Sequence, residues 1–370
     1  MNYPLPKNTW CYGEFYLLYP QLTLFLRAYM GDSKLKTAVL GLDDNGRLLL
    51  EAVSKIDYFE IQAVADKDAS LVESTAYKYK CTPYDDYRQL IIQNQLDCLL
   101  VAAGLYSCDK YVKMAMKKKF NVLKLPPLAR NFEEAVEFVR LAENENIKFA
   151  IANTYQFAQS FIALRESLQQ GQFEQTFLIT AVCTVGGQRI GAWQSDPKLA
   201  GGGVLLRDCY ELINQIISTF GAPEQVYALN TNTAGDKQQR LYLTEDTAVL
   251  AMKFTDTTLG NLITSRAFGT EQKYLKVYGK DKILTVDSAH FIISDSLENI
   301  TQQSEYDDDR FILLTKSLES FALSILSPDK NKLCSSGRDN LRDMAVIESA
   351  YLSARTGFPE EPAKVLQRAS

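Results

Sequence analysis

The sequence has a single histidine and no pair of cysteines separated by two residues, and these shortages exclude several kinds of site. Because His290 is the only histidine, no mechanism that needs two histidines can operate. The seven cysteines are scattered and odd in number. That pattern is typical of reduced, mostly buried thiols in a cytoplasmic protein rather than of a disulfide framework or a zinc site. We therefore expect a cytoplasmic protein without a metal site.

An excess of positive charge and a long apolar run are also missing. The net charge is −5 and the pI is near 5.3, so nucleic acid is not an expected partner. The apolar segment Phe15–Met30 is interrupted by Pro20, Gln21 and Arg27, which leaves it far short of the roughly 20 residues that span a bilayer. No signal-peptide pattern accompanies it. We expect no membrane span, and interpret residues 1–33 as an extension packed on the body or on a second subunit.

The length of 370 residues favours two domains, since single cores rarely exceed about 250–300 residues. In residues 34–152, apolar runs alternate with amphipathic helical patterns, which predicts a doubly wound, mainly parallel α/β sheet. After the first run and its helix, the expected strands are 59–66, 96–102, 121–125 and 148–152, and the expected helices are 85–94, 107–119 and 132–146.

In residues 153–370 the pattern changes to several strand-like segments without helices between them, which predicts an α+β domain with an open, mainly antiparallel sheet. We expect an open sheet face to be covered by another subunit, and so predict a homo-oligomer through this sheet. The expected strands are 175–184, 224–229, 240–244, 248–254, 261–268, 271–278 and 283–286, with helices at 159–170, 203–219, 310–326 and 336–356.

The first apolar run meets a glycine turn that resembles a dinucleotide-binding motif but carries the wrong charge. The three positions of G-x-G-x-x-G read Gly41, Asp43 and Gly46, so a carboxylate, with Asp44 beside it, replaces the glycine that lets the backbone approach a diphosphate. Asp66 ends the second strand about 20 residues later, where an acid binds the ribose and favours NAD over NADP. The alternative is that Asp66 only caps the next turn. We predict NAD or NADP as the cofactor, bound weakly or not at all.

The segment Trp193–Asn214 resembles the signature of the Gfo/Idh/MocA oxidoreductases. Asp196, Pro197 and the triple glycine Gly201–Gly203 match it. The similarity extends over nearly all of the chain from residue 34, including 121–129 and 336–356. The resemblance implies a Rossmann domain that holds NAD or NADP, and a sheet domain over which a sugar, inositol or other polyol is oxidised or reduced.

The family's lysine, aspartate and histidine, which orient the substrate hydroxyl and move its proton, are absent from their motif positions. The lysine position reads Pro126, with Lys124 two residues earlier, and the other two positions read Arg207 and Glu211. The candidate catalytic residues are Lys124, Arg207 and Glu211, together with Tyr155, which matches a family segment on the substrate side. Arg207 and Glu211 are one helical turn apart, which favours an ion pair. The alternative is that Arg207 binds an anionic ligand, because its planar fork suits carboxylates.

The remaining candidates follow from matching positions in the family. On the cofactor side they are Gly41, Asp43, Asn45, Gly46, Asp66, Ala102, Ala103 and Gly104, and on the substrate side Asn153, Trp193, Asp208 and Tyr210. For Trp193, Asp208 and Tyr210, ordinary packing is the competing interpretation.

Three functions remain open. The leading one is an oxidoreductase homologue with degraded catalytic motifs that binds a dinucleotide weakly. The second is an active NAD(P)-dependent enzyme that acts on a sugar, polyol or conjugated substrate through non-standard residues. The third is a non-catalytic scaffold or regulatory protein.

Overall fold

A computed structural model describes residues 34–171, 173, 175–187, 191–234, 243–267 and 269–369 of the chain. The expected extension 1–33 lies outside these residues. The described chain forms two compact units, and the first comprises residues 34–125, 138–152 and 314–337. The second comprises residues 126–137, 153–313 and 338–369. Among the described residues, every helix is too short or too polar to cross a bilayer.

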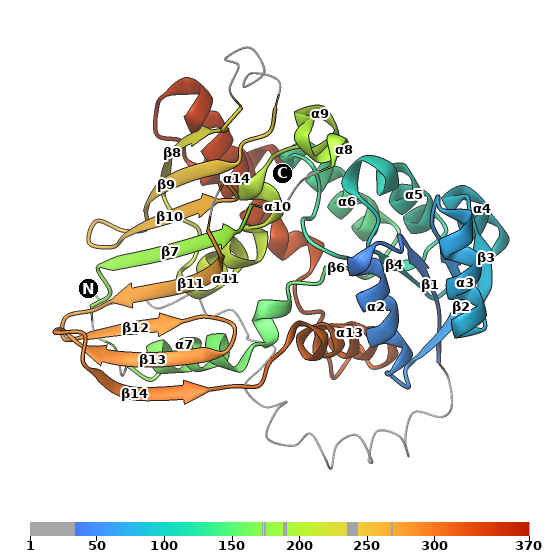
Figure 1. Ribbon diagram of the computed structural model, residues 1–370, viewed down its shortest axis with the longest axis horizontal. Coiled ribbons are helices and arrows are strands. Elements are labelled where there is room, and N and C mark those ends of the chain that lie inside the picture. Colours follow the sequence, from blue (N-terminus) through green and yellow to red (C-terminus); the bar gives the residue numbers. More distant parts are fainter. Residues whose placement is uncertain are drawn as a thin grey trace. The chain divides into compact units, whose positions relative to one another are not determined.

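The first unit contains a six-stranded parallel sheet with the order β3-β2-β1-β4-β5-β6 (Figure 1). The order reverses between β1 and β4, which is the topological switch point of a doubly wound sheet. The predicted α/β architecture is confirmed. The strands are β1 Leu35–Leu40, β2 Phe59–Ala65, β3 Thr82–Tyr84, β4 Cys98–Val101, β5 Asn121–Lys124 and β6 Phe149–Ile151.

Helices cover both faces of this sheet, with α2 and α13 on one face and α5 and α6 on the other (Figure 1). Aspartates begin several of them, because the carboxylate accepts hydrogen bonds from first-turn N–H groups; Asp68 does so for α3, a helix that the sequence pattern did not predict. The helices are α2 Asp44–Ser54, α3 Ala69–Tyr79, α4 Tyr87–Gln93, α5 Leu105–Lys117, α6 Phe132–Asn144 and α13 Arg310–Leu326.

The second unit contains an eight-stranded sheet with the order β14-β13-β12-β11-β7-β10-β9-β8. Only β7 and β10 pair in parallel, which confirms the mainly antiparallel prediction. The sequence pattern missed β13 and β14, since β14 is almost entirely polar. Its expected strand 240–244 is not confirmed, because 243 and 244 are irregular and 240–242 lie outside the described residues. The strands are β7 Leu178–Val185, β8 Gln225–Thr231, β9 Thr247–Lys253, β10 Leu259–Ser265, β11 Glu271–Tyr278, β12 Lys282–Val286, β13 His290–Asp295 and β14 Ile300–Glu305.

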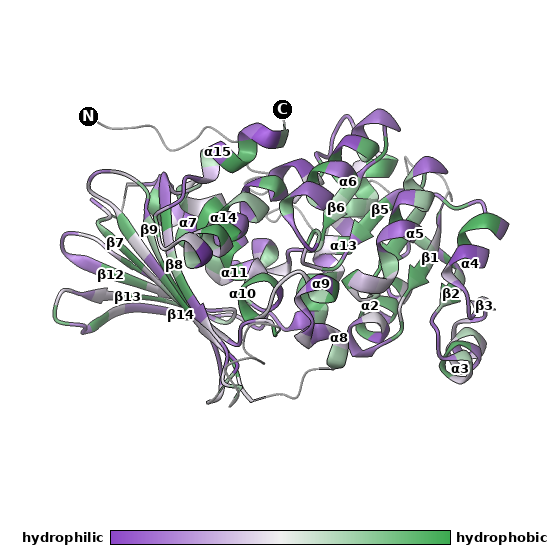
Figure 2. Cartoon of the chain, turned by 90° about the horizontal axis from the view of Figure 1, so that it is seen from above, coloured by the Kyte–Doolittle hydropathy of each residue, from purple (hydrophilic) through white to green (hydrophobic). Residues whose placement is uncertain are grey.

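Helices pack on one face of this sheet, and no described element covers the other (Figure 2). The single helix predicted over 203–219 is wrong in one respect, because it breaks at Asp208 and Cys209 into α10 and α11. The helices of the unit are η2 Thr154–Phe157, α7 Gln159–Gln169, α8 Ala192–Ser195, α9 Pro197–Ala200, α10 Val204–Arg207, α11 Tyr210–Phe220, α14 Gly337–Thr356, α15 Pro362–Leu366 and η3 Gln367–Ala369.

Candidate functional site

The glycine turn after β1 keeps the backbone frame of a dinucleotide site. Gly41 has φ +89°, and a Cβ there would lie 2.4 Å from the backbone nitrogen of Ala103. A Cβ on Gly46 would lie 2.0 Å from the carbonyl oxygen of Gly41. Both glycines are therefore required, the first for the left-handed turn and the second for the close approach of α2 to the strand.

Asp43 places a carboxylate at the N-terminus of α2. Its Oδ1 accepts a hydrogen bond from the backbone N–H of Gly46 at 3.0 Å and caps the helix. Asp44 and Asn45 follow in the first turn and are exposed. The end of a helix after such a turn is where a diphosphate is bound in this type of fold, so the side chain of Asp43 occupies that hydrogen-bonding position.

Asp66, at the end of β2, holds the glycine turn. Its Oδ2 accepts from the N–H of Leu42 at 2.7 Å, and its Oδ1 accepts from the N–H of Asp68 at 3.2 Å. A carboxylate has about four lone-pair positions, so these two bonds leave capacity for a ribose hydroxyl.

A cavity of about 440 Å³ lies beyond the carboxyl ends of β2 and β3. Open α/β sheets bind their ligands at this edge. One of the cavity's lining residues, Lys67, directly follows Asp66 in the chain. The cavity is lined by Lys67, Asp85, Asp86, Tyr87, Gln89 and Tyr111.

The cofactor-side candidates Ala102, Ala103 and Gly104 follow β4, and the catalytic candidate Lys124 ends β5. The N–H groups of Ala102 and Ala103 both donate to the carbonyl of Leu40, at 2.8 and 2.9 Å, and tie the end of β4 to β1. Gly104 precedes α5 with φ −55°, which is not a left-handed conformation. Lys124 is only 2% exposed. It lies near the thiol of Cys108. Burial raises the pKa of that thiol to about 12, and the positive charge of Lys124 opposes the rise.

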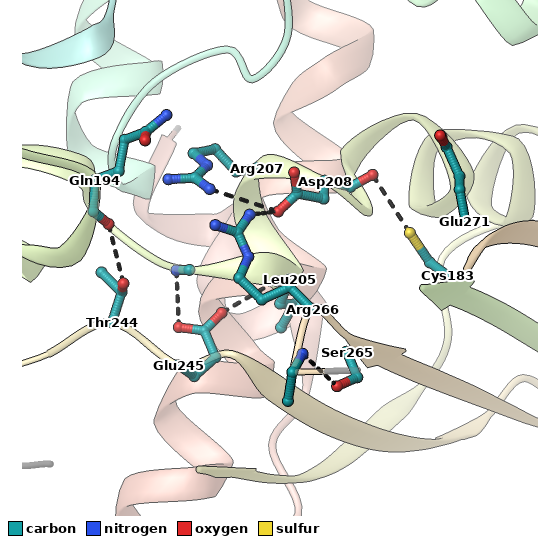
Figure 3. A network of polar contacts seen from close by, with 12 residues as sticks. Cys183, Gln194, Leu205, Arg207, Asp208, Thr244, Glu245, Ser265, Arg266 and Glu271 are labelled. Carbon is teal, nitrogen blue, oxygen red and sulfur yellow. Dashed lines mark hydrogen bonds and ion pairs between the residues drawn. The ribbon is translucent and has the colours of Figure 1, made fainter. Parts of the chain in front are cut away.

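In the second unit, the triple glycine packs against a buried carboxylate. A Cβ on Gly203 would lie 1.8 Å from the carbonyl oxygen of Glu245. The side chain of Glu245 accepts from the N–H groups of Gly203 and Leu205 at 2.8 and 3.1 Å (Figure 3). It also accepts from the hydroxyl of Tyr351 at 2.8 Å. Burial raises the pKa of Glu245 above its ordinary value. Sequence analysis did not find this residue.

Two arginines share one aspartate immediately beside this loop (Figure 3). Arg266, which follows β10, forms a short ion pair with Asp208, and an Arg207 nitrogen lies 3.8 Å from the same carboxylate oxygen. The Arg266 side chain is 8% exposed and that of Arg207 13%. Burial lowers the pKa of Arg207, while the charge of Asp208 raises it. Asp208 is thus engaged by arginines, and Arg266 is a site residue that sequence analysis missed.

The expected ion pair between Arg207 and Glu211 is not formed. Glu211 instead accepts hydrogen bonds from the N–H and the hydroxyl of Thr154, at 2.6 and 2.7 Å. The prediction assumed one continuous helix, but the break at Asp208 ends the one-turn relation between the two side chains.

Tyr155 and Lys273 are both partly buried and lie close enough for each to shift the pKa of the other, and we call them the Tyr155–Lys273 pair. Lys273 lies opposite Cys183 in the β11–β7 register, and its Nζ is 2.9 Å from Glu271. Burial raises the pKa of Tyr155 above its ordinary value, and Lys273 opposes that rise. Burial would lower the pKa of Lys273, but Tyr155 and Glu271 outweigh it and raise the value. At neutral pH the pair is therefore a neutral phenol beside a cation.

Two substrate-side candidates, Asn153 and Tyr210, are buried and hydrogen-bonded within the second unit. Asn153 and Tyr210 have no exposed surface, and both donate to Oδ1 of Asn340, at 2.7 and 3.1 Å. Their hydrogen bonds are internal, so they support the packing of η2, α11 and α14. Trp193 lies in α8 and is partly exposed.

Both units match models of one protein family. Residues 35–153 match the NAD-binding Rossmann fold of the oxidoreductase family named Gfo/Idh/MocA, and residues 165–361 match its C-terminal alpha/beta domain. The chain belongs to the Gfo/Idh/MocA oxidoreductase family. The family resemblance inferred from the sequence motifs is thereby confirmed.

Individual members of the Gfo/Idh/MocA family are distant relatives. An uncharacterised oxidoreductase of Schizosaccharomyces pombe is 26% identical over 206 residues, 52% of this chain and 54% of that protein, so the chain spans about half the length of this relative. The 2,7-anhydro-N-acetylneuraminate hydratase of Escherichia coli is 21% identical over 300 residues, 74% of each protein. An Agrobacterium radiobacter oxidoreductase, solved with NAD+, L-tartaric acid and magnesium, superposes with a TM-score of 0.77 at 16% identity, covering 90% of this chain and 99% of that one.

Proposed function

We propose that this chain is an NAD-dependent oxidoreductase that acts on a hydroxyl group of a small polar molecule, with Tyr155 and Lys273 in place of the usual family residues. The observation that carries the proposal is the partly buried Tyr155–Lys273 pair on the helix-covered face of the second sheet. Related proteins support this substrate class, since one is named for a neuraminate derivative and another was solved with L-tartaric acid.

The pair supplies the proton that the family chemistry requires. When bound, NAD+ would accept the hydride in oxidation and NADH would supply it in reduction. A neutral phenol donates a hydrogen bond or a proton to an oxygen that gains negative charge, and general acids of this kind contribute about 10²–10⁴-fold to rate. The adjacent Lys273 cation stabilises that negative charge. The raised pKa of Tyr155 keeps its phenol protonated at neutral pH, which is the form that donates a proton during carbonyl reduction.

The residues of the first unit fit a nicotinamide dinucleotide in part. The two glycines preserve the turn, Asp66 retains lone pairs for a ribose, and the cavity beside Lys67 lies at the expected sheet edge. A carboxylate at this position disfavours the 2′-phosphate of NADP, which supports NAD. Asp43 is the residue that opposes binding, because its carboxylate holds the N–H of Gly46.

Replacing Asp43 with asparagine is expected to tighten NADH binding by about 10-fold. Two unit charges 4 Å apart repel by about 4 kcal/mol at an effective dielectric of 20, and solvent at this exposed position reduces that value to about 1–2 kcal/mol. Asparagine keeps the helix cap while it removes the charge. Titration followed by NADH fluorescence measures the effect. Asp57→Asn, beyond the end of α2, is the control, and equal affinities in wild type and Asp43→Asn would contradict the prediction.

A second candidate function is a family member that binds ligands without turnover. Asp43 at the helix end favours it, as do Pro126, Arg207 and Glu211 at the positions of the family's catalytic groups. NADH absorbance at 340 nm, followed with a panel of keto-sugars, keto-acids and the corresponding alcohols plus NAD, separates the candidates. Turnover that requires Tyr155 supports the enzyme, while NADH binding without turnover of any panel member supports the binding protein.

We also propose that two copies of the chain pair through the uncovered face of the second sheet. Leu229, Val249 and Ile263 lie side by side in the register of β8, β9 and β10, and are 59%, 44% and 43% exposed. An exposed apolar row across neighbouring strands indicates an interface, because such patches are uncommon on monomers. A second copy would cover it by a two-fold contact.

Replacing Ile263 with glutamate is expected to convert the oligomer to monomers. A charge in the centre of an apolar interface loses its hydration without gaining a partner. Light scattering coupled to size exclusion measures the mass. Glu298→Gln, at an exposed turn outside the row, should leave the oligomer intact, and a monomeric wild type would contradict the proposal.

A further inference from the structure

The pair of arginines around Asp208 has more positive charge and more hydrogen-bond donors than the described residues use. Arg207 and Arg266 face one carboxylate, that of Asp208. Glu245 also lies near Arg207 and acts on it electrostatically. The hydrogen bonds of its side chain, however, come from Gly203, Leu205 and Tyr351. Guanidinium groups keep their protons in proteins, so two cations share the single carboxylate with which they form ion pairs.

Two buried N–H donors of these arginines have no hydrogen-bond partner within the described part of the chain. They are Nη1 of Arg207 and Nε of Arg266. A buried N–H that loses its water without a hydrogen bond costs about 1–3 kcal/mol, and more when it is charged. Native proteins rarely leave such atoms unpaired, and each one that remains calls for an explanation, such as strain, a catalytic role, or a bound water or ion. Because the two arginines engage the same carboxylate, one anionic group bound beside them could satisfy both donors.

We propose that Arg207 and Arg266 bind a carboxylate of the substrate. A carboxylate offers two oxygens in the planar arrangement that guanidinium forks recognise, and such charge-assisted bonds are about twice as strong as neutral ones. The substrate class is therefore a sugar acid or hydroxy acid rather than a neutral polyol. This inference rests on the proposed function, because it describes the substrate of that reaction.

We define the anion site as Arg207, Asp208 and Arg266. It is connected to the Tyr155–Lys273 pair through Cys183. The thiol of Cys183 donates to the carbonyl of Asp208 at 3.4 Å, and Cys183 is opposite Lys273 in the sheet register. Cys183 of β7 therefore contacts the anion site and is also the register partner of Lys273 in the neighbouring strand β11. The site would fix the acid group of a substrate whose hydroxyl or carbonyl lies toward the pair.

Calorimetric titration of the full chain with acids and their neutral counterparts tests this inference. The probes are D-glucuronate against its methyl ester, D-gluconate against sorbitol, and L-tartrate against its dimethyl ester. We expect at least one acid to bind at least 30-fold more tightly than its counterpart. The preference should fall to less than 3-fold in Arg266→Gln and in Arg207→Gln, whereas Arg355→Gln, at an exposed arginine of α14, should retain it.

Arg266 is buried, so its glutamine variant can fail to fold; Arg207→Lys, at the more exposed arginine, then replaces it. Lysine keeps the charge but loses the planar fork, and should weaken acid binding about 10-fold with an unchanged melting temperature. Equal binding of acids and neutral counterparts in wild type would overturn the inference even if NADH binds and is oxidised. Acid binding through the arginines without NADH binding would support it while contradicting the proposed function.

Discussion

Replacing Tyr155 with phenylalanine is expected to lower kcat for NADH-dependent carbonyl reduction by about 10²–10³-fold. The substitution removes only the hydroxyl. The ring, which stacks on Phe161 with centroids 5.4 Å apart, keeps its packing. NADH affinity should not change, because the residue lies outside the unit that contains the glycine turn. Stopped-flow single-turnover kinetics measures the chemical step directly.

The pH profile separates a proton donor from a packing residue. The pKa of Tyr155 is raised by burial, so the phenol stays protonated through neutral and moderately alkaline pH, and the wild-type reduction rate should not fall up to about pH 9 on account of this group. Lys273→Met removes the neighbouring cation, and we expect kcat to fall about 10-fold or more, since a positive charge beside the reacting oxygen is lost.

The sheet supplies matched controls for both variants. Tyr274 and Lys276 alternate with Lys273 along β11 and so point to the opposite face. Tyr274→Phe and Lys276→Met should keep wild-type kcat within about 2-fold. If Tyr155→Phe also turns over at the wild-type rate, the phenol has no part in proton transfer. The same assay on Lys124→Ala tests Lys124, the lysine nearest to the position where the family has its catalytic lysine and this chain has Pro126. Lys124 is buried near Cys108.

Much of the architecture followed from the sequence because the signals were local. The alternation of apolar runs with helical patterns identified the parallel sheet, and the glycines at 41 and 46 marked a turn whose tight packing the structure explains. The triple glycine was also recognised, and its Gly203 has no room for a side chain against Glu245. In each case the residue type itself reports the backbone geometry.

The functional side chains were harder to predict because their partners are distant in sequence. Glu211 bonds to Thr154, 57 residues earlier, and Arg266 reaches Asp208, 58 residues earlier. No helical spacing contains such information. Lys273 did carry a local signal, since it is two and four residues before the buried Leu275 and Val277 and therefore lies on the same, covered face of the sheet. That exception to the apolar pattern would have identified it.

Replacing Glu245 with alanine is expected to destabilise the second unit by about 3–5 kcal/mol. The substitution leaves the N–H groups of Gly203 and Leu205 and the hydroxyl of Tyr351 without their acceptor, and each buried unsatisfied group costs about 1–3 kcal/mol. Glu245→Gln should cost only about 1–2 kcal/mol, since the amide oxygen still accepts hydrogen bonds. Urea unfolding measures both, and Glu298→Gln at an exposed turn is the control.

The pH dependence of that difference tests whether the carboxyl group is protonated in the fold. Burial raises the pKa of Glu245 in the folded chain above its ordinary value of 4.5, so folding favours the proton-bound form. Its contribution to stability is therefore full below about pH 4.5 and is lost as the pH rises through the folded value, at about 1.4 kcal/mol per pH unit. Glutamine cannot titrate. The advantage of wild type over Glu245→Gln should shrink as the pH rises from 4.5, and a constant difference up to pH 8 would mean that the three donors hold the group as a carboxylate.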